Sequence, residues 1–185
     1  MEPRSSRGLA AIFMSKDFWI ELAKDLAFTA GFVLVLVGLL YAYSGVWPPM
    51  VAVEGHSMLP NLKPDDLIIM QSLDRASVTT YNEAVDRGYK AFNDFGDVIV
   101  FKPMGDSTVT PVIHRAMYYV EEGQPMWTGG PPAPHSGYIT QGDNNYLYDQ
   151  SSPISQNQPV KKEWVLGVSQ FRIPYLGKLR TLLGV

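Results

Sequence analysis

The residues of this chain best suited to chemistry are one serine, one histidine and two aspartates that lie far apart in the sequence. Ser57 comes first, His114 follows, and Asp143 and Asp149 lie downstream. A serine hydroxyl is almost fully protonated at neutral pH, so it becomes a nucleophile only when a base and an orienting group lie beside it. The order of these residues permits such a site, provided that the fold brings them together.

The composition argues against several other kinds of site. The chain has no cysteine, which removes thiol nucleophiles, thiolate zinc sites and disulfides together. Its 3 histidines, His56, His114 and His135, form no pair at the HExxH spacing of a zinc hydrolase. Neither a ligand cluster nor a phosphate-binding glycine motif occurs, so we expect no metal, nucleotide or organic cofactor. A net charge of -3 implies no nucleic-acid partner.

Two residues compete with His114 for the role of the base. His56 adjoins the nucleophile, but neighbours on an extended segment point to opposite faces, so its ring is not expected to reach the Ser57 hydroxyl. Lys102 is the nearby rival for a Ser-Lys dyad, although a charge at a strand end is the simpler interpretation. His135 lies in a loop rich in proline and glycine and is expected to be solvated.

An uncharged apolar run from Leu26 to Trp47 precedes the serine. As a helix rising about 1.5 Å per residue, it would cover roughly the 30 Å hydrocarbon core of a bilayer. A secretory signal peptide has a shorter apolar region of about 7–15 residues, although Ala42 and Ser44 do give a small-x-small pattern that a cleavage site could use. We therefore expect residues 26–47 to be an uncleaved transmembrane anchor.

Basic residues are distributed unequally about this run, and their distribution predicts its orientation. None follows the run until Lys63, whereas four precede it: Arg4, Arg7, Lys16 and Lys24. The positive-inside rule then predicts a cytoplasmic N terminus and an extracytoplasmic remainder. Residues 1–25 are expected to form a cytoplasmic amphipathic segment that lies along the membrane surface or simply extends the anchor. Pro48 and Pro49 cannot continue the helix, so Ser57 should lie near the membrane face.

Residues 48–170 are predicted to form a mainly β domain with short helical inserts. Short apolar or β-branched runs separated by Pro, Gly and Asp predict strands at Leu67–Met70, Asp97–Phe101, Val109–Ile113 and Met117–Val120. A polar insert between the first two is expected to hold a brief helix at Asn82–Lys90, and Gly123–Gly137 should be an irregular loop. Residues 171–185 form an amphipathic tail that rests either on the outer leaflet or on the β domain.

Four blocks of the β domain occur together behind the single anchor. They are Gly55-His56-Ser57-Met58-Leu59-Pro60, Asp97-Val98-Ile99-Val100-Phe101, Val112-Ile113-His114-Arg115, and Gly142-Asp143-Asn144-Asn145 with Asp149; a fifth, Arg172-Ile173-Pro174-Tyr175-Leu176-Gly177, comes late. Jointly these blocks resemble type I signal peptidases of the archaeal and endoplasmic-reticulum branch, from about Val51 to Gly177. The bacterial branch uses a lysine where this chain has His114. A neutral histidine can accept a proton without the strong desolvation that a lysine requires.

The resemblance implies a signal-peptidase-like β domain and a membrane-anchored serine endopeptidase. Ser57 would be the nucleophile and His114 the base. Asp149 matches the third catalytic position, and Asp143 would brace the site, although the sequence leaves open which aspartate contacts His114. The implied substrates are secretory preproteins cut after small residues (A-x-A), at the plasma membrane or, in a eukaryote, the endoplasmic-reticulum membrane, with the bilayer and the secretion translocon as partners. Met58 and Leu59 are expected to help line the substrate pockets.

One departure from the family pattern concerns the residue two positions before the nucleophile. Family members often carry a serine there, whose hydroxyl helps bind the oxyanion, but this chain has Gly55. The oxyanion would then depend on backbone N–H groups such as that of Ser57. Two other interpretations remain open: a related Ser-Lys self-cleaving or repressor-type enzyme, disfavoured because those proteins are soluble and use lysine, and a non-catalytic membrane-anchored β module that binds a secretion partner.

Overall fold

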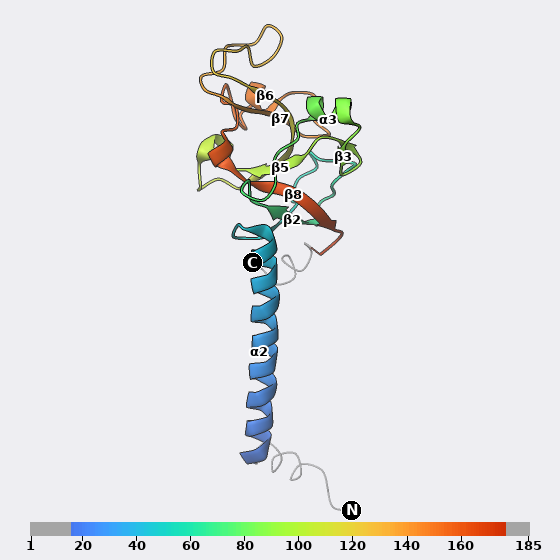
Figure 1. Ribbon diagram of the computed structural model, residues 1–185, viewed down its shortest axis with the longest axis vertical. Helices are drawn as coiled ribbons and strands as arrows, with labels where there is room; N and C mark the ends of the chain where they lie inside the picture. Colours follow the sequence, from blue (N-terminus) through green and yellow to red (C-terminus); the bar gives the residue numbers. More distant parts are fainter. Residues whose placement is uncertain (1–15, 177–185) are drawn as a thin grey trace, which may run out of the picture. The chain divides into compact units, whose positions relative to one another are not determined.

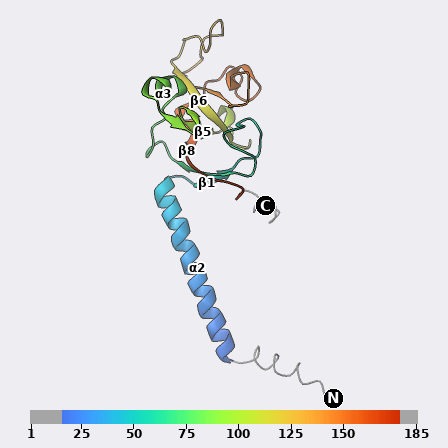
Figure 2. The same cartoon turned by 90° about the vertical axis from the view of Figure 1, so that its right-hand side faces the viewer.

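The computed structural model describes residues 16–176. The chain divides into two compact units, Met1–Ala42 and Tyr43–Val185, which are considered separately. The first unit contains one long helix, and the second contains an antiparallel sheet with short helices and turns, as Figure 1 and Figure 2 show.

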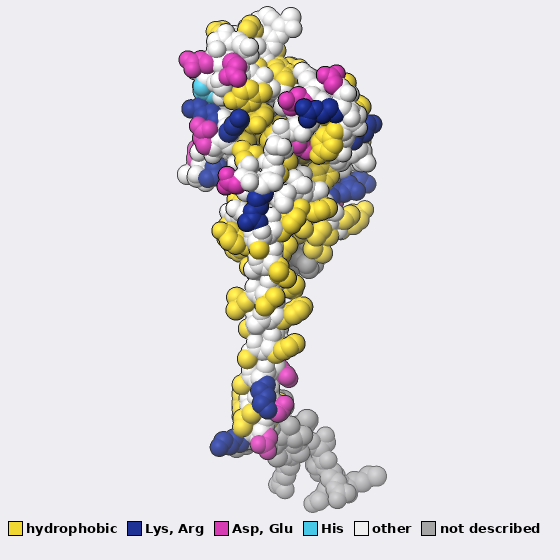
Figure 3. Space-filling view, viewed as in Figure 1, with side chains coloured by type: hydrophobic (Ala, Val, Ile, Leu, Met, Phe, Trp, Pro, Cys, Tyr) yellow, Lys and Arg dark blue, Asp and Glu magenta, His cyan; other side chains and the backbone are white. Residues whose placement is uncertain are grey.

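Helix α2 (Lys16–Ser44) is the one helix of the described residues that is long and apolar enough to cross a membrane. Its large side chains, such as Phe28 and Leu34, are exposed to the surroundings. Figure 3 shows hydrophobic side chains along the helix and charged ones only near its N-terminal end. The helix ends at Ser44 because Gly45 adopts a positive φ of 71°. Residues 16–25 thus extend the apolar helix, and residues 1–15 lie outside the described part.

The second unit is built on one curled, six-stranded antiparallel sheet with the strand order β1-β2-β8-β5-β6-β7. Strand β8 lies between β2 and β5, so it joins the β1–β2 pair to the β5–β6–β7 group. The strands are β1 (Met50–Ala52), β2 (Leu67–Gln71), β5 (Val98–Phe101), β6 (Val112–Val120), β7 (Gly137–Gln141) and β8 (Val165–Ile173).

Smaller elements connect these strands. Helix α3 (Tyr81–Arg87) begins with a capping box formed by Thr80 and Glu83, which satisfies two orphan N–H groups at once. A hairpin of β3 (Lys90–Ala91) and β4 (Asp94–Phe95) follows it. Three 3-10 turns complete the described elements: η1 (Pro103–Gly105), η2 (Asp149–Ser151) and η3 (Lys162–Trp164).

The core surrounds β5, whose four residues are fully buried. One hydrophobic cluster packs Ile99 and Phe101 against β8 and the loop that follows β7. A second cluster packs Val98 against β2 and the segment that carries the nucleophile, including Met58 and Leu62. Strand β5 therefore packs against the loop that carries Ser57.

The structure confirms a mainly β unit but revises the predicted strands. The predictions at 67–70 and 97–101 correspond to β2 and β5, and the predicted helix overlaps α3. The two predicted strands at 109–113 and 117–120 are wrong as separate strands, because the single strand β6 includes the end of the first and all of the second; residues 109–111 lie before it. Strands β1, β7 and β8 were not predicted. The expected boundary between residues 170 and 171 falls inside β8, which pairs with β2 up to Ile173.

The outer face of the β1–β2–β8 edge carries two rows of apolar residues, and Gln71 at the end of β2 is the polar residue beside them. Residues that pair across antiparallel strands share a face, as do alternate residues along one strand. Two cross-strand rows therefore lie on one face: Met50, Ile69 and Phe171, and Ala52, Leu67 and Ile173. All six are partly or largely exposed, and the ring of Tyr43 lies 6.0 Å from that of Phe171. The water-facing side of an antiparallel sheet is usually polar, so these strands lack the expected alternation of apolar and polar residues.

Candidate active site

The structure brings Ser57, His114 and Asp149 into one chain of contacts. His114 Nε2 lies 2.8 Å from Ser57 Oγ, and His114 Nδ1 lies 2.7 Å from Asp149 Oδ2. Ser57 follows β1, His114 lies on β6, and Asp149 begins η2. His114 and Asp149 are almost fully buried, at 2% and 1% exposure, whereas Ser57 is partly exposed. The serine is thus open to a substrate, while the groups behind it are shielded from water.

The surroundings of Asp149 determine the tautomer of His114. Thr140 on β7 donates its hydroxyl to Asp149 Oδ2 at 2.7 Å, so this carboxylate oxygen accepts from both Thr140 and His114. The imidazole proton then lies on Nδ1, which leaves Nε2 free to accept the proton of the Ser57 hydroxyl. Gln150 in turn accepts from the Thr140 backbone N–H at 3.0 Å, which holds η2 against β7.

Asp143 does not contact His114; it binds Arg115, the next residue along β6. The Arg115 guanidinium donates two parallel hydrogen bonds to Asp143, both of 2.8 Å, and Asn61 donates a third of 2.8 Å. Arg115 is 1% exposed, and its remaining NH1 group donates to backbone carbonyls that include Gly96 O at 2.6 Å. This buried ion pair links β6 to the loop after β7, and the Asn61 hydrogen bond connects both to the loop after Ser57.

The turn at Gly142 lies directly against the nucleophile segment. Asn144 donates its backbone N–H to Ser57 O at 2.7 Å and its side-chain amide to His56 O at 3.2 Å. A Cβ atom on Gly142 would lie 2.7 Å from Ser57 O and 2.9 Å from His114 Nε2, closer than such contacts allow. The lack of space therefore requires glycine here, and it lets the acidic loop approach both Ser57 and His114.

Asp97, just before β5, is another buried acid near Arg115. It accepts from Thr79 N and from the Tyr89 hydroxyl, each at 2.7 Å. Burial raises the pKa of Asp97, while these two hydrogen bonds and the nearby Arg115 lower it. Burial, reinforced by Asp97, raises the pKa of Tyr89 to about 12, so the tyrosine remains a hydrogen-bond donor at physiological pH. Asp97 therefore accepts hydrogen bonds from residues on both sides of α3, from Thr79 before the helix and from Tyr89 after it.

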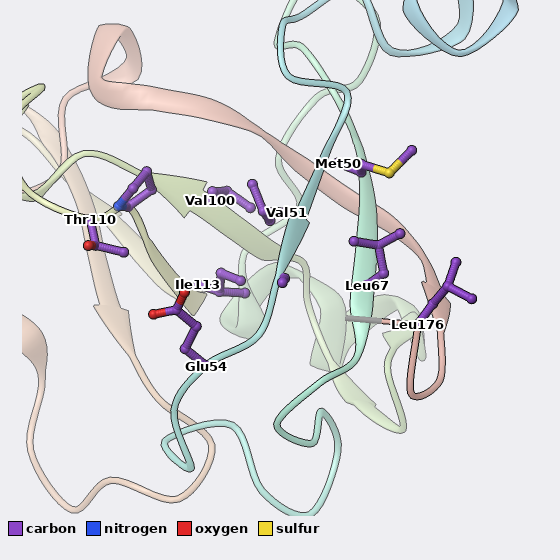
Figure 4. Close-up of a pocket in the computed structure, with 10 residues that line it drawn as sticks. Met50, Val51, Glu54, Leu67, Val100, Thr110, Ile113 and Leu176 are labelled. Atoms are coloured by element: carbon purple, nitrogen blue, oxygen red, sulfur yellow. The ribbon is translucent and has the colours of Figure 1, made fainter. Parts of the chain in front are cut away.

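A cavity of about 290 Å³ opens beside Ser57 and His114. Its walls come from the chain just before each of these residues, in segments 52–55 and 110–113, with Ile154 closing one side. It shares several wall residues with a larger apolar cavity of about 540 Å³, in which Val51, Val100 and Ile113 lie close together (Figure 4). Met58 borders the smaller cavity, although it is 1% exposed and mainly belongs to the core; Leu59 does not line it.

The other candidates of the sequence lie away from the Ser57 hydroxyl or have structural contacts. The side chain of His56 is exposed, and its carbonyl accepts from the loop at Asn144. Lys102 is exposed and donates to Ser107 Oγ at 3.0 Å. His135 was expected to be solvated, but it is partly buried: its Nε2 lies 2.9 Å from Gln158 Oε1, and its ring packs edge-on against Trp164. No group of three or more His, Asp or Glu among residues 16–176 could hold a metal ion.

Sequence reasoning missed three residues that hold the site together. Arg115 had a usable signal, because a charged residue within an otherwise apolar strand must be paired if that strand is buried. Thr140 and Asn61 had no such signal, since a lone threonine in a strand and an asparagine in a turn are ordinary residues. Their roles depend on contacts with residues far away in the sequence.

Comparison with known proteins does not assign the chain to a family. No protein-family model matches it. A search of curated proteins finds no significant sequence match. The function must therefore be argued from the geometry of the site itself.

Proposed function

We propose that the chain is a membrane-anchored serine endopeptidase that removes signal peptides from secretory preproteins after small residues. The observation that carries this proposal is the Ser57–His114–Asp149 chain of contacts beside an open cavity, with the base and the acid buried and the nucleophile accessible. The resemblance of the sequence blocks to the archaeal and endoplasmic-reticulum signal peptidases gives the substrate class.

The proposed reaction needs only groups of this chain and water. Ser57 Oγ attacks the scissile carbonyl carbon while its proton passes to His114 Nε2, and Asp149 stabilises the resulting imidazolium. The C–N bond then breaks, and His114 returns the proton to the leaving amine, which leaves an acyl group on Ser57. Water attacks this ester, its proton passes to His114, and the C–O bond to Ser57 breaks as the proton returns to Oγ.

Two free strand edges beside the site support an extended peptide as the substrate. Among the described strands, β1 pairs only with β2. On β6 the pairing with β7 begins at Arg115, so no described strand pairs with the β7 side of Val112–His114. Both segments line the cavity at Ser57. A peptide laid between them would gain main-chain hydrogen bonds from one or both edges, and its alternate side chains would enter the cavity. Small side chains near the cut suit a space of this size.

The position of Gly55 predicts a gain of activity by substitution. A Cβ atom there would have Ser57 Oγ at 3.9 Å and Ser57 N at 4.0 Å as its nearest neighbours, so a serine fits without displacement. We expect Gly55→Ser to raise kcat towards the factor of about 10² that one oxyanion donor supplies. Gly55→Ala is the matched control and should give no gain. Equal kcat values for the two variants would show that residue 55 does not face the oxyanion.

We further propose that α2 spans the plasma membrane, or the endoplasmic-reticulum membrane in a eukaryote, with its N terminus in the cytoplasm and the β unit outside. The basic residues before the apolar run support this orientation. The apolar outer face of β1, β2 and β8 begins at Met50, shortly after the helix ends, and suits contact with lipid. The signal segment of a substrate would then remain in the bilayer while its cleavage site reaches Ser57.

Contact of this face with lipid predicts the response of site-specific probes. The chain has no cysteine, so single cysteines at Ile69 or Phe171 can each carry an environment-sensitive fluorophore. In vesicles the emission of both should shift to the blue and be quenched by lipid-borne quenchers. A probe at Glu121, which is exposed on another part of the unit, should show neither effect. Equal quenching at all three positions, or at none, would contradict the contact.

The decisive test of the enzymatic function uses the full chain in detergent with a preprotein that carries an A-x-A site. The wild type should release the mature protein, and Ser57→Ala and His114→Ala should not. Release that persists in both variants would refute the proposed catalysis. The absence of cleavage by the wild type would favour the non-catalytic β module that binds a secretion partner.

A further inference from the structure

The acidic loop also borders Ser57, and its residues 142–147 are not among those that line the cavity. The cavity walls come mainly from residues that precede Ser57 and His114, so the cavity suits the part of a substrate that becomes the acyl group. The departing chain must leave on another side, within reach of His114 Nε2, which returns the proton to its amine. Gly142 and Asn144 form the chain next to Ser57 O, and the space at the Gly142 Cα directly adjoins His114 Nε2.

The tip of this loop carries two strongly exposed apolar side chains. Tyr146 is 101% exposed, the highest value among the large hydrophobic residues of the described chain, and Leu147 is 62% exposed. The loop is fixed on both sides of this tip. Asn145 accepts from the Gln141 side chain at 2.7 Å, and Tyr148 packs edge-on against Tyr118 with ring centres 5.6 Å apart. The two apolar side chains are thus held out into solvent on a braced loop.

The length of the loop limits how far this tip can lie from the chemistry. Tyr146 is four residues after Gly142, so their Cα atoms are at most about 14 Å apart. An extended peptide advances about 3.3 Å per residue, so the tip lies within reach of roughly the first four residues after the cut. Loops on rigid scaffolds commonly carry such specificity contacts.

We infer that Tyr146 and Leu147 bind the first residues after the cleavage site, the amino-terminal end of the released protein. This inference rests on the proposed peptidase function and assigns its leaving-group specificity. The aromatic ring and the isobutyl group offer apolar contact to side chains of the departing segment. The chain therefore selects substrates on both sides of the scissile bond, by the cavity before it and by the loop tip after it.

The test compares two peptides that share one signal segment and A-x-A site but differ in the four residues after the cut. One peptide carries apolar residues there, and the other carries Gly and Ser. In the full chain in detergent, Tyr146→Ser with Leu147→Ser should lower kcat/KM for the apolar peptide about five- to tenfold, mainly through KM, and change the Gly/Ser peptide less than about twofold. Val85→Ser, at another exposed apolar position, should leave both unchanged.

A charge at the tip gives a second, independent readout. Tyr146→Lys should raise kcat/KM for a peptide with acidic residues after the cut relative to one with basic residues, and salt should weaken this preference. The inference would be overturned if the tip variants changed kcat/KM equally for all peptides or did not change it. It would also be overturned if kcat/KM fell in vesicles but not in detergent, because the tip would then contact lipid. If the wild type cuts neither peptide, the proposed function fails and the inference fails with it; unchanged selectivity with active wild type refutes the inference alone.

Discussion

Asp149→Asn is expected to lower kcat for preprotein cleavage by about 10⁴, the loss typical when the acid of a serine triad becomes an amide. The carboxylate accepts from His114 Nδ1 and from Thr140 through the same oxygen. An amide has no charge to stabilise the imidazolium that forms when Ser57 attacks. If its NH2 group faces His114, it also forces the proton onto Nε2, where it blocks acceptance of the serine proton. The measurement is kcat with a saturating preprotein substrate.

The matched control for this variant is its stability. The asparagine side chain retains the size of the aspartate and can still hydrogen-bond to the Thr140 hydroxyl, which can donate or accept, so the midpoint of chemical denaturation should shift little. Thr140→Val, which removes only the hydroxyl donor, should lower kcat much less. Wild-type kcat in Asp149→Asn would show that His114 does not need a carboxylate. Loss of activity together with loss of folded protein would instead make Asp149 a structural residue.

Asp143→Ala is expected to act on stability, in contrast with Asp149. Arg115 and Asp143 form a bidentate ion pair with 1% and 4% side-chain exposure. Removing one partner of a buried pair leaves an uncompensated charge and typically lowers the free energy of unfolding by about 3 to 5 kcal/mol. Asn61 also loses its acceptor. Denaturant titration followed by tryptophan fluorescence should show an earlier midpoint, and activity should fall with the folded fraction.

Replacing both partners of the pair separates charge from packing. Because the desolvation cost of two buried charges disappears with them, Arg115→Met with Asp143→Leu should be less destabilised than Asp143→Ala alone. A stability for Asp143→Ala within about 0.5 kcal/mol of wild type, the usual range for surface substitutions, would show that the pair is not a brace. The same variant with full stability but no activity would move Asp143 into the chemistry.

The elements that could be predicted have a signal in their own sequence, namely a run of apolar or β-branched residues. The apolar run before Pro48 predicted α2, and the β-branched runs at 67–70 and 97–101 predicted β2 and β5. Strand β8 was missed because its exposed end, Phe171–Ile173, looked like the start of an amphipathic tail, and only its pairing with β2 gives it strand geometry. Strand β7 begins with a glycine after a Pro/Gly-rich loop and had no clear periodicity. Long-range pairing decides such segments more than intrinsic propensity does.

The candidate site was predictable in residue type but not in geometry. Ser57 and His114 could be chosen because few residues offer a nucleophile and a base in this chain. The choice between Asp143 and Asp149 stayed open, since both follow β7 within a few residues. The register of β6 against β7 decides it, because Arg115 pairs with Gln141 and lies beside the loop that carries Asp143. Asp149 reaches His114 because the chain returns to β7 at the start of η2, where Asp149 and Gln150 both bind Thr140.

The central position of β8 has a consequence for the timing of activity. Ser57 lies between β1 and β2, and His114 belongs to the β5–β6–β7 group. The strand that joins these two parts, β8, is the last of the described strands to be synthesised. A ribosome makes all of the catalytic side chains before it makes the residues that hold them in register. A nascent chain is thus expected to carry an inactive serine until residues 165–173 pair with β2 and β5, so the proposed enzyme would cut only after its own synthesis is nearly finished.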